Sequence, residues 1–380
     1  MNKSLPHPGG RALIGTWLRQ AKSIARNTRQ TLLMPITFPQ RRFFLLLAVG
    51  LFVPTARLWA DEPAEAIAKL IEQAKQETGK IEVFGKPLNP QQNEEMSRRI
   101  SAFYRTTIVT DFFSALHAEK AGSVIQNVKL GVNSGIDVFW TGATIAQLLK
   151  QNDVVAGPEW VKALGLSPTL AMSDNGVRID DETLASVMYN TSVLEPVQVP
   201  KTYADLQKDK SLAHRIALPR TAATFIYISY GIGEDATISL ARALMGPQQA
   251  TLFPTYPDVR ARVLSGEFAI GIGTDGIMAK RTGAPAGLAP IDPMVVVPTG
   301  AWLMKDAQHP AGGKLVVYWL TTPDGQKALN DILGISLVTT PGTELSKQAE
   351  GKTPKIVSYD YVVSAASKML PVYNQILGIR

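Results

Sequence analysis

Apolar residues recur at helical spacing and then at strand spacing along most of the 380-residue chain. Ile67, Leu70 and Ile71 share one face of a helix that ends by Gly79, and an apolar strand over 81–85 follows it. Further strands are expected at Thr106–Phe112, Ile136–Gly142, Ala185–Asn190, Arg215–Arg220, Phe268–Ile272 and Met294–Gly300. Helical segments separate most of these strands, so the pattern predicts an α/β fold with largely parallel sheets. In such folds ligands bind beyond the carboxyl ends of the strands.

The stretch 259–305 has the richest pattern: a short helix, a tight turn, a buried strand, a glycine-rich bend and a second apolar strand. Gly271, Gly273 and Gly276 spell G-x-G-x-x-G after the first strand, and Asp292 follows sixteen residues later. This is the outline of a dinucleotide fingerprint, and it would make the chain a periplasmic NAD(P)-dependent oxidoreductase. A Gly-Ala-Pro run, however, breaks the following helix within about two turns, which disfavours that interpretation.

Four short motifs, in this order, favour a different interpretation. They are Trp-Thr-Gly at 140–142, Ser-Gly-Glu-Phe-Ala-Ile-Gly at 265–271, His-Pro at 309–310 and Thr-Pro-Asp-Gly-Gln at 322–326. With these motifs the chain resembles bacterial extracellular solute-binding proteins of the ferric-iron and small-anion type, over roughly residues 64–340. These proteins are the capture subunits of ABC importers.

The resemblance implies a type II periplasmic binding protein fold, with two α/β lobes and a cleft between them. It implies crossing strands near Val187–Asn190 and Val296–Gly300, which act as a hinge when the lobes close over a solute. We expect residues 341–380 to form a helical tail that packs on the first lobe. The expected ranges are 61–187 and 297–380 for the first lobe, and 188–296 for the second.

The candidate ligand-binding residues follow expected strands or begin expected helices. Backbone N–H groups at a helix start favour an anion. The guanidinium group of Arg220 can bind a carboxylate or phosphate through two hydrogen bonds. We therefore expect a small organic anion as solute: a phosphorylated, phosphonate or carboxylate compound. The candidates are Lys86, Ser114, Trp140, Thr141, Tyr189, Arg220, Thr221, Thr224, Thr274 and Asp275.

Ferric iron is a further alternative within the same family. The resemblance implies that its iron-binding members carry two adjacent tyrosines just after the strand that ends at Gly271. Here that position reads Thr-Asp-Gly-Ile-Met over 274–278, without a tyrosine pair, so the sequence disfavours iron.

The first sixty residues carry the features of an export signal. They hold nine Lys and Arg and no Asp or Glu, so the remaining chain is close to neutral despite an overall net charge of +7. An eleven-residue apolar run, 43–53, is too short to span a bilayer, and we expect cleavage after Ala60 into the periplasm. Arg41-Arg42 fits a twin-arginine signal, an ordinary Sec signal remains the alternative, and translation starting at Met34 would give a leader of normal length.

Composition excludes several other classes. The chain has no cysteine, and His117, His214 and His309 lie in no zinc or hydrolase motif, so we expect neither catalytic residues nor a metal or cofactor. The near-neutral body disfavours nucleic acid as a partner. We expect a non-enzymatic monomer that works with an ABC permease and ATPase. A sensor that keeps the fold but signals instead of importing is an alternative that the sequence leaves open.

Overall fold

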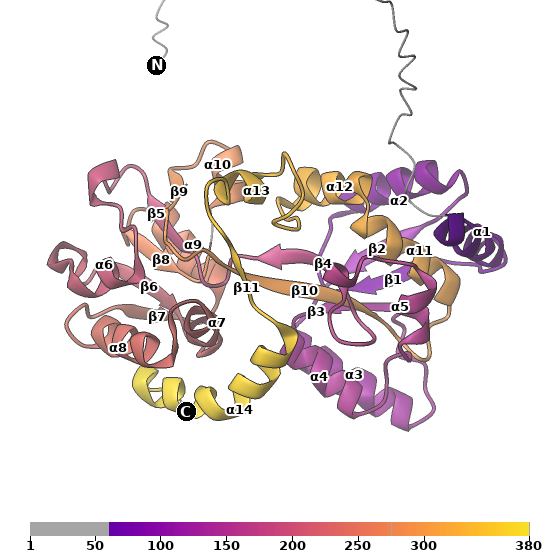
Figure 1. The fold of residues 1–380 in the computed structure, drawn as a ribbon, viewed down its shortest axis with the longest axis horizontal. Coiled ribbons are helices and arrows are strands. Elements are labelled where there is room, and N and C mark those ends of the chain that lie inside the picture. The colour runs from indigo at the N-terminus through magenta and orange to yellow at the C-terminus, as the bar shows by residue number, and fades with distance from the viewer. Residues whose placement is uncertain (1–60, 275, 380) are drawn as a thin grey trace, which may run out of the picture. The chain divides into compact units, whose positions relative to one another are not determined.

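The computed structural model describes residues 61–274 and 276–379, and the predicted leader and Asp275 lie outside them. The strands of this part form two sheets, each covered by helices (Figure 1). We call the elements around the first sheet the first lobe and those around the second sheet the second lobe. Among the described helices, none has the length and apolarity needed to cross a membrane.

The first sheet has six strands in the order β11-β10-β3-β1-β2, with β4 paired to β10. β1 runs parallel to β2 and β3, whereas β10 runs antiparallel to β3 and β4. The strands are β1 (Ile81–Phe84), β2 (Thr110–Phe113), β3 (Val138–Thr141), β4 (Val177–Glu182), β10 (Val295–Leu303) and β11 (Lys355–Ile356). The alternation of strands and helices matches the predicted α/β class, whereas the sheet mixes parallel and antiparallel pairs and is not largely parallel as predicted.

The second sheet has five strands in the order β7-β6-β8-β5-β9. β6 runs parallel to β7 and β8, and β5 runs antiparallel to β8 and β9. The strands are β5 (Val187–Asn190), β6 (Ile216–Pro219), β7 (Thr251–Phe253), β8 (Ile270–Ile272) and β9 (Ala286–Leu288).

Helices cover both faces of each sheet, which explains why the strands are almost continuously apolar. Successive residues of a strand point to opposite faces, so Val83 packs with one helix layer and Phe84 with the other. In the second lobe, Ile216 and Leu218 face the layer that contains Phe225, while Ala217 faces the opposite layer.

The helices of the first lobe begin at recognisable caps. Asn89 accepts a hydrogen bond from Gln92 N at 2.9 Å and forms a capping box, as the Asn-Pro pair predicts. The helices are α1 (Asp61–Ala74), α2 (Pro90–Tyr104), α3 (His117–Lys129), α4 (Ala143–Gln151), α5 (Glu159–Ala163), α11 (Pro310–Thr321), α12 (Pro323–Leu333) and α13 (Glu344–Gln348). A short 3₁₀ helix, η1 (Pro168–Leu170), lies between α5 and β4.

The second lobe uses the same devices. Thr202 and Asp205 form the predicted capping box at the start of α6. Its helices are α6 (Tyr203–Lys208), α7 (Ala223–Ile232), α8 (Glu234–Met245), α9 (Tyr256–Leu264) and α10 (Ile277–Arg281), with the 3₁₀ helices η2 (Pro196–Gln198) and η3 (Lys210–Leu212).

The chain passes from the first sheet to the second between β4 and β5, at residues 183–186, and returns between β9 and β10, at residues 289–294. The sequence places these crossings near 187–190 and 296–300, inside the observed strands β5 and β10. The observed crossings lie a few residues earlier because each strand pairs within one sheet only.

The predicted end of the last apolar strand at Pro298-Thr299-Gly300 is wrong. β10 continues to Leu303, and its pairing register with β4 shifts between Thr299 and Gly300. A bulge of this kind accommodates proline and glycine without ending the strand. Sequence signals for a turn and for a bulge are the same here, and pairing on both sides decides between them.

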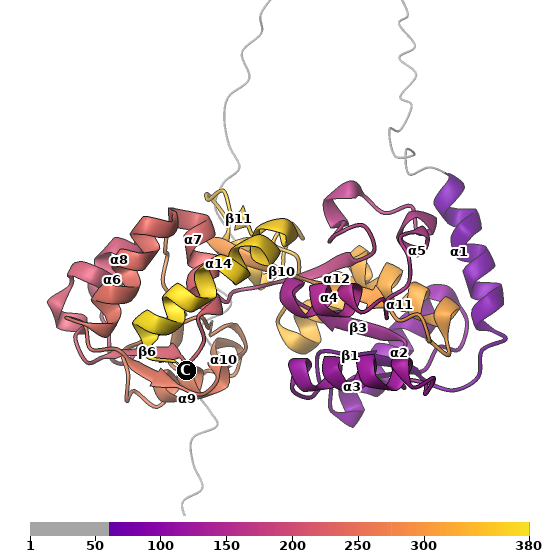
Figure 2. The same cartoon turned by 90° about the horizontal axis from the view of Figure 1, so that it is seen from below.

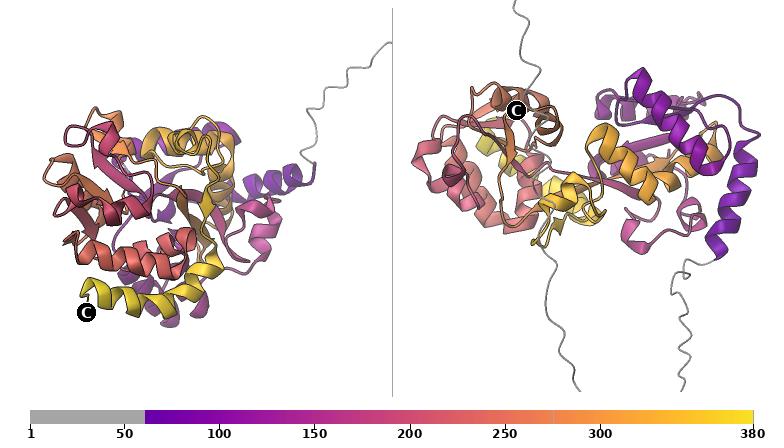
Figure 3. Two further views of the ribbon diagram at one scale, coloured as in Figure 1. Left: turned by 60° about the vertical axis from the view of Figure 1, so that its left-hand side comes forward. Right: turned by 90° about the horizontal axis from the view of Figure 1, so that it is seen from above.

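The C-terminal helix α14 (Tyr359–Leu377) packs on α7 and α8 of the second lobe and on α4 of the first. Figure 2 shows it running beside α8, and in Figure 3 it lies next to the same red helices. The sequence predicts the helix but assigns it to the first lobe. Its buried residues, such as Tyr373 against Phe225, identify the second lobe as the larger contact.

Candidate functional site

A cavity of about 160 Å³ lies where the first crossing, α9, the loop after β8 and the end of α12 meet. A volume of this size admits several water molecules or one small solute. Residues of both lobes line it. Its polar lining is contributed by Asp181, Glu182, Thr183, Tyr256, Arg260, Gly273 and Thr274.

A charged network stands at the carboxyl ends of β1 and β4. The Lys86 ammonium forms an ion pair with Glu182, and its Nζ lies 3.9 Å from Oδ2 of the fully buried Asp180. Burial raises the pKa of Asp180 to about 6, although the Lys86 charge opposes that rise. The first-lobe wall therefore carries a lysine held between two carboxylates.

Trp140 forms hydrogen bonds with residues of this network from its buried side. Its indole N–H donates to Asp180 Oδ1 at 2.9 Å and to Thr299 Oγ1 at 2.7 Å, and Thr299 also bonds to Asp180. The side chain is 1% exposed, and Lys86 Nζ lies 5.7 Å from the centre of its ring. Trp140 thus orients the buried carboxylate from within the core.

His117, the first residue of α3, lies close to the same network. Its Nε2 lies 3.2 Å from the carbonyl oxygen of Gly85, which can only accept, so this nitrogen carries the proton. Nδ1 then accepts from Thr141 Oγ1 at 3.0 Å. Burial lowers the pKa of His117, which agrees with a neutral ring.

The second-lobe wall contributes several hydroxyl groups. Thr224 is buried and lies 3.1 Å from the Tyr256 hydroxyl. Burial raises the pKa of Tyr256 to about 12, and the Glu182 carboxylate adds to the rise. Burial also raises the pKa of Tyr227, with contributions from Tyr256 and Glu182. Glu182 is therefore close enough to both phenols to affect their ionisation, although it belongs to the other lobe.

Three other charges near the cavity differ in their partners. Asp181 forms a buried ion pair with Arg178 (Nε to Oδ1, 2.8 Å) and accepts from Val338 N at 2.7 Å, so its charge is compensated. Arg260, on the exposed side of α9, has no ion-pair partner among residues 61–274 and 276–379. It is a cationic group of the lining with which no described side chain forms an ion pair.

The three glycines of the G-x-G-x-x-G pattern have packing reasons. A Cβ on Gly271 would approach Val259 and Val263 of α9 to within 3 Å, and one on Gly276 would lie 2.6 Å from Ala286. Gly273 has a φ of +86°. α10 has only five residues, whereas a dinucleotide fold needs a long helix at this point.

The structure brings some predicted site residues together and separates others. Lys86 and Thr141 belong to the first-lobe wall, and Thr224 and Thr274 belong to the second-lobe wall. Asp275 lies outside the described residues.

The remaining candidates make local contacts away from the cavity lining. Ser114 Oγ donates to the next carbonyl oxygen at 3.3 Å, and the Tyr189 ring packs over Gly287. Arg220 is exposed, and Thr221 Oγ1 accepts from the backbone two residues later at 3.2 Å.

Sequence reasoning missed His117, Glu182, Tyr227, Tyr256 and Arg260. Two of them had usable signals. Glu182 ends an acidic run on an apolar strand, just before a crossing, and Tyr256 follows Thr255, whose capping box with Asp258 starts α9. The others depend on which helix face meets the opposite lobe, and that is a tertiary property.

Comparison with known proteins is consistent with this architecture. The sequence model of bacterial extracellular solute-binding proteins matches residues 116–327, which is more than half of the chain. The chain belongs to the bacterial extracellular solute-binding protein family. A search of curated proteins finds no match.

Solved structures similar to this solute-binding protein establish its fold. Iron-bound HitA from Pseudomonas aeruginosa is 17% identical, with a TM-score of 0.59 over 79% of this chain and 99% of that chain. The substrate binding protein of an ABC transporter from Agrobacterium tumefaciens is 17% identical, with a TM-score of 0.62 over 78% and 95%. The ferric binding protein from Campylobacter jejuni is 15% identical, with a TM-score of 0.61 over 79% and 100%.

These likenesses confirm the predicted type II periplasmic binding protein fold and its two lobes. As a member of this family, the chain is an extracellular solute-binding protein. Such proteins bind solutes, and their family implies a periplasmic location. The family is not an enzyme family.

Proposed function

We propose that the solute-binding protein captures a small organic anion in the cavity between its lobes and delivers it to a membrane permease. The observation that carries this proposal is Arg260, a cavity-lining guanidinium without an ion-pair partner among the described residues. A guanidinium binds carboxylate, phosphate or phosphonate groups through two parallel hydrogen bonds. Thr274, Thr183 and Tyr256 add hydroxyl groups to the same lining.

In this proposal residues of the two lobes bind different parts of the solute. Arg260 and Thr274 recognise the anionic group, while Lys86 and Glu182 bind a polar group elsewhere on the solute. Thr224 holds the Tyr256 hydroxyl in position. Thr141 and Trp140 act indirectly, since each bonds to a group of the first-lobe wall.

The remaining steps follow from the predicted leader and the family. Cleavage after Ala60, by the Sec or the twin-arginine route, releases a monomer into the periplasm. The loaded protein then docks on a permease that an ATPase drives. It carries out no chemistry on its solute and needs no cofactor.

Ferric iron is the second candidate. Two phenols, Tyr227 and Tyr256, lie near the carboxylate of Glu182, and hard oxygen ligands of this kind suit a hard cation. The adjacent tyrosine pair of the iron-binding relatives is missing, however, and burial raises the pKa of both phenols, so ionising them without a metal is costly.

Native mass spectrometry of residues 61–380, purified without refolding, tests the proposal. Mild denaturation should release one small organic anion per chain. Release of iron, together with a visible charge-transfer band, would favour the second candidate. A released dinucleotide would contradict solute capture and revive the oxidoreductase interpretation.

A further inference from the structure

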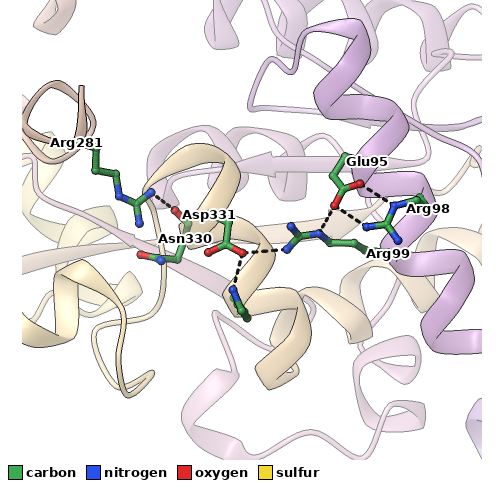
Figure 4. Close-up of polar contacts among 7 residues, drawn as sticks. Glu95, Arg98, Arg99, Arg281, Asn330 and Asp331 are labelled. Atoms are coloured by element: carbon green, nitrogen blue, oxygen red, sulfur yellow. Dashed lines mark hydrogen bonds and ion pairs between the residues drawn. The ribbon is translucent and has the colours of Figure 1, made fainter. Parts of the chain in front are cut away.

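A contact between α10 of the second lobe and the end of α12 of the first lobe lies beside the cavity. The Arg281 guanidinium donates a hydrogen bond to the carbonyl oxygen of Asn330 (Figure 4). Asn330 lies in the last turn of α12, where backbone carbonyls carry the partial negative charge of the helix end and attract cations. Ile277 and Gly334, which flank this contact, both line the cavity.

Met278 adds an apolar part to the same contact. Gly334 caps α12 with a φ of +71°, and a Cβ at this position would lie 2.7 Å from Met278 Cγ. The methionine is 38% exposed, yet it fills the space that the missing side chain leaves. Arg281 Nη1 also lies 3.7 Å from the Met278 sulfur. The two side chains therefore meet the first lobe as one unit.

The first-lobe side of the contact is held firmly. Asn330 Oδ1 accepts from Glu344 N at 3.2 Å, and Asp331 pairs with Arg99 at 3.1 Å and with Lys327 at 2.7 Å. Glu95 on α2 in turn binds Arg99 at 2.7 Å, so the end of α12 is tied to α2 (Figure 4). Because α12 is fixed within its lobe, separation of the lobes must break the contact with α10.

We propose that Arg281 and Met278 form an interlobe clasp that sets solute affinity without touching the solute. The clasp exists only when the lobes are closed, so it raises the closed fraction of the solute-free protein. When only a fraction of the protein is in the binding-competent state, the apparent Kd equals the intrinsic Kd divided by that fraction. A larger closed fraction therefore lowers the apparent Kd, so the clasp strengthens binding. This role in affinity rests on the proposed capture of a solute, whereas the conformational effect of the clasp does not.

The absence of cysteine from the chain permits a direct test on the solute-free protein. Spin labels on Glu94→Cys of α2 and Ala204→Cys of α6, both exposed and on different lobes, report the interlobe distance. Arg281→Ala should lower the ratio of the closed population to the open population roughly threefold, as expected for loss of one exposed, charge-assisted hydrogen bond. Met278→Ala should act in the same direction.

Lys280→Ala is the matched control, because it removes the same charge from the same exposed helix. Lys280 has no ion-pair partner among the described residues, so this variant should keep the wild-type distance distribution. Circular dichroism melting checks that all variants fold. Unchanged distances in folded Arg281→Ala, or an equal change in Lys280→Ala, would overturn the clasp. Both outcomes are independent of solute identity, so the clasp can fail while capture holds, and the reverse.

Discussion

Two arginines near the cavity show how a partner decides the use of a charge. Arg178 is buried and fully engaged by Asp181, and loss of either partner would leave an uncompensated buried charge. Arg260 lines the cavity, and no described side chain forms an ion pair with it. Arg178 lies on β4 and Arg260 lies on α9. Of the two, only Arg260 has a charge available to a solute.

We therefore predict that Arg260→Ala binds the solute more weakly. Loss of a hydrogen bond between charged groups costs about 2 kcal/mol, or roughly 30-fold in Kd. Calorimetric titration of unloaded protein with the solute released from the wild type measures this change. Arg262→Ala is the control, since Arg262 lies on the same helix but pairs with Glu267 at 2.6 Å. Equal affinities of the two variants would exclude Arg260 from the anion site.

The surroundings of His309 predict that the free energy of unfolding depends on pH. Burial alone would lower its pKa, but the hydrogen bonds to Asp137 and to the Thr78 carbonyl, each 2.8 Å, outweigh that effect and raise it. Both ring nitrogens donate when the ring is protonated. The unfolded chain therefore loses this proton near pH 6.5, and the folded chain at a higher pH.

The His309 contribution is consequently complete below pH 6.5 and is lost as the pH rises through the folded-state pKa. In urea titrations between pH 6 and 9, His309→Gln should lose less stability than the wild type. The difference between the two proteins isolates His309 from His117, whose lowered pKa acts in the opposite direction. A pH profile parallel to that of the wild type would contradict the prediction.

At the scale of elements, the sequence predicts most helices and strands because each is one local pattern with a local stop. Its errors arise where a local signal has two tertiary meanings, as at the β10 bulge. The site is less predictable for the same reason. Thr274 could be found from the glycine loop, whereas Arg260 lines the cavity only because of the way α9 packs on the second sheet.

Gly85 allows β1 and β3 to pack closely, and the effect of replacing it on the free energy of unfolding can be measured. It directly follows β1 with a φ of +152°, and a Cβ there would lie 2.7 Å from Trp140 Cβ on the neighbouring strand. Gly85→Ala should lower the free energy of unfolding by more than about 2 kcal/mol, because the overpacked strands must separate. Urea denaturation at an unchanged m-value measures the loss.

Gly131→Ala provides the comparison for Gly85→Ala. Gly131 has a φ of +70°, but nothing lies within 4 Å of an added Cβ, so only the backbone strain of about 1 kcal/mol is expected. If the two variants were equally stable, close packing between β1 and β3 would not explain the glycine at position 85.

At the scale of the whole molecule, α14 joins what the chain order separates. Most of the helix lies on the second lobe, where Tyr361 bonds to Ser229 at 2.8 Å. Its first residue reaches the first lobe, where the Tyr359 hydroxyl lies 2.9 Å from Gln147 Oε1. The two lobes also share a continuous apolar core that includes residues of this helix. The tail should therefore couple the unfolding of the two lobes.

The tryptophans make this coupling measurable, because within residues 61–380 all four lie on elements of the first lobe: Trp140, Trp160, Trp302 and Trp319. Their fluorescence reports on the first lobe, although the Trp302 ring also lies 6.5 Å from the Tyr359 ring of α14, whereas far-ultraviolet circular dichroism follows both lobes. In the protein 61–380 the two thermal transitions should coincide, as for one cooperative unit. Deletion of residues 359–380 uncovers Phe225 and its neighbours on α7, which Tyr373 buries, so the second lobe should melt first. The circular dichroism transition would then precede the fluorescence transition, while coincident transitions in the truncated protein would show that α14 is not needed to couple the lobes.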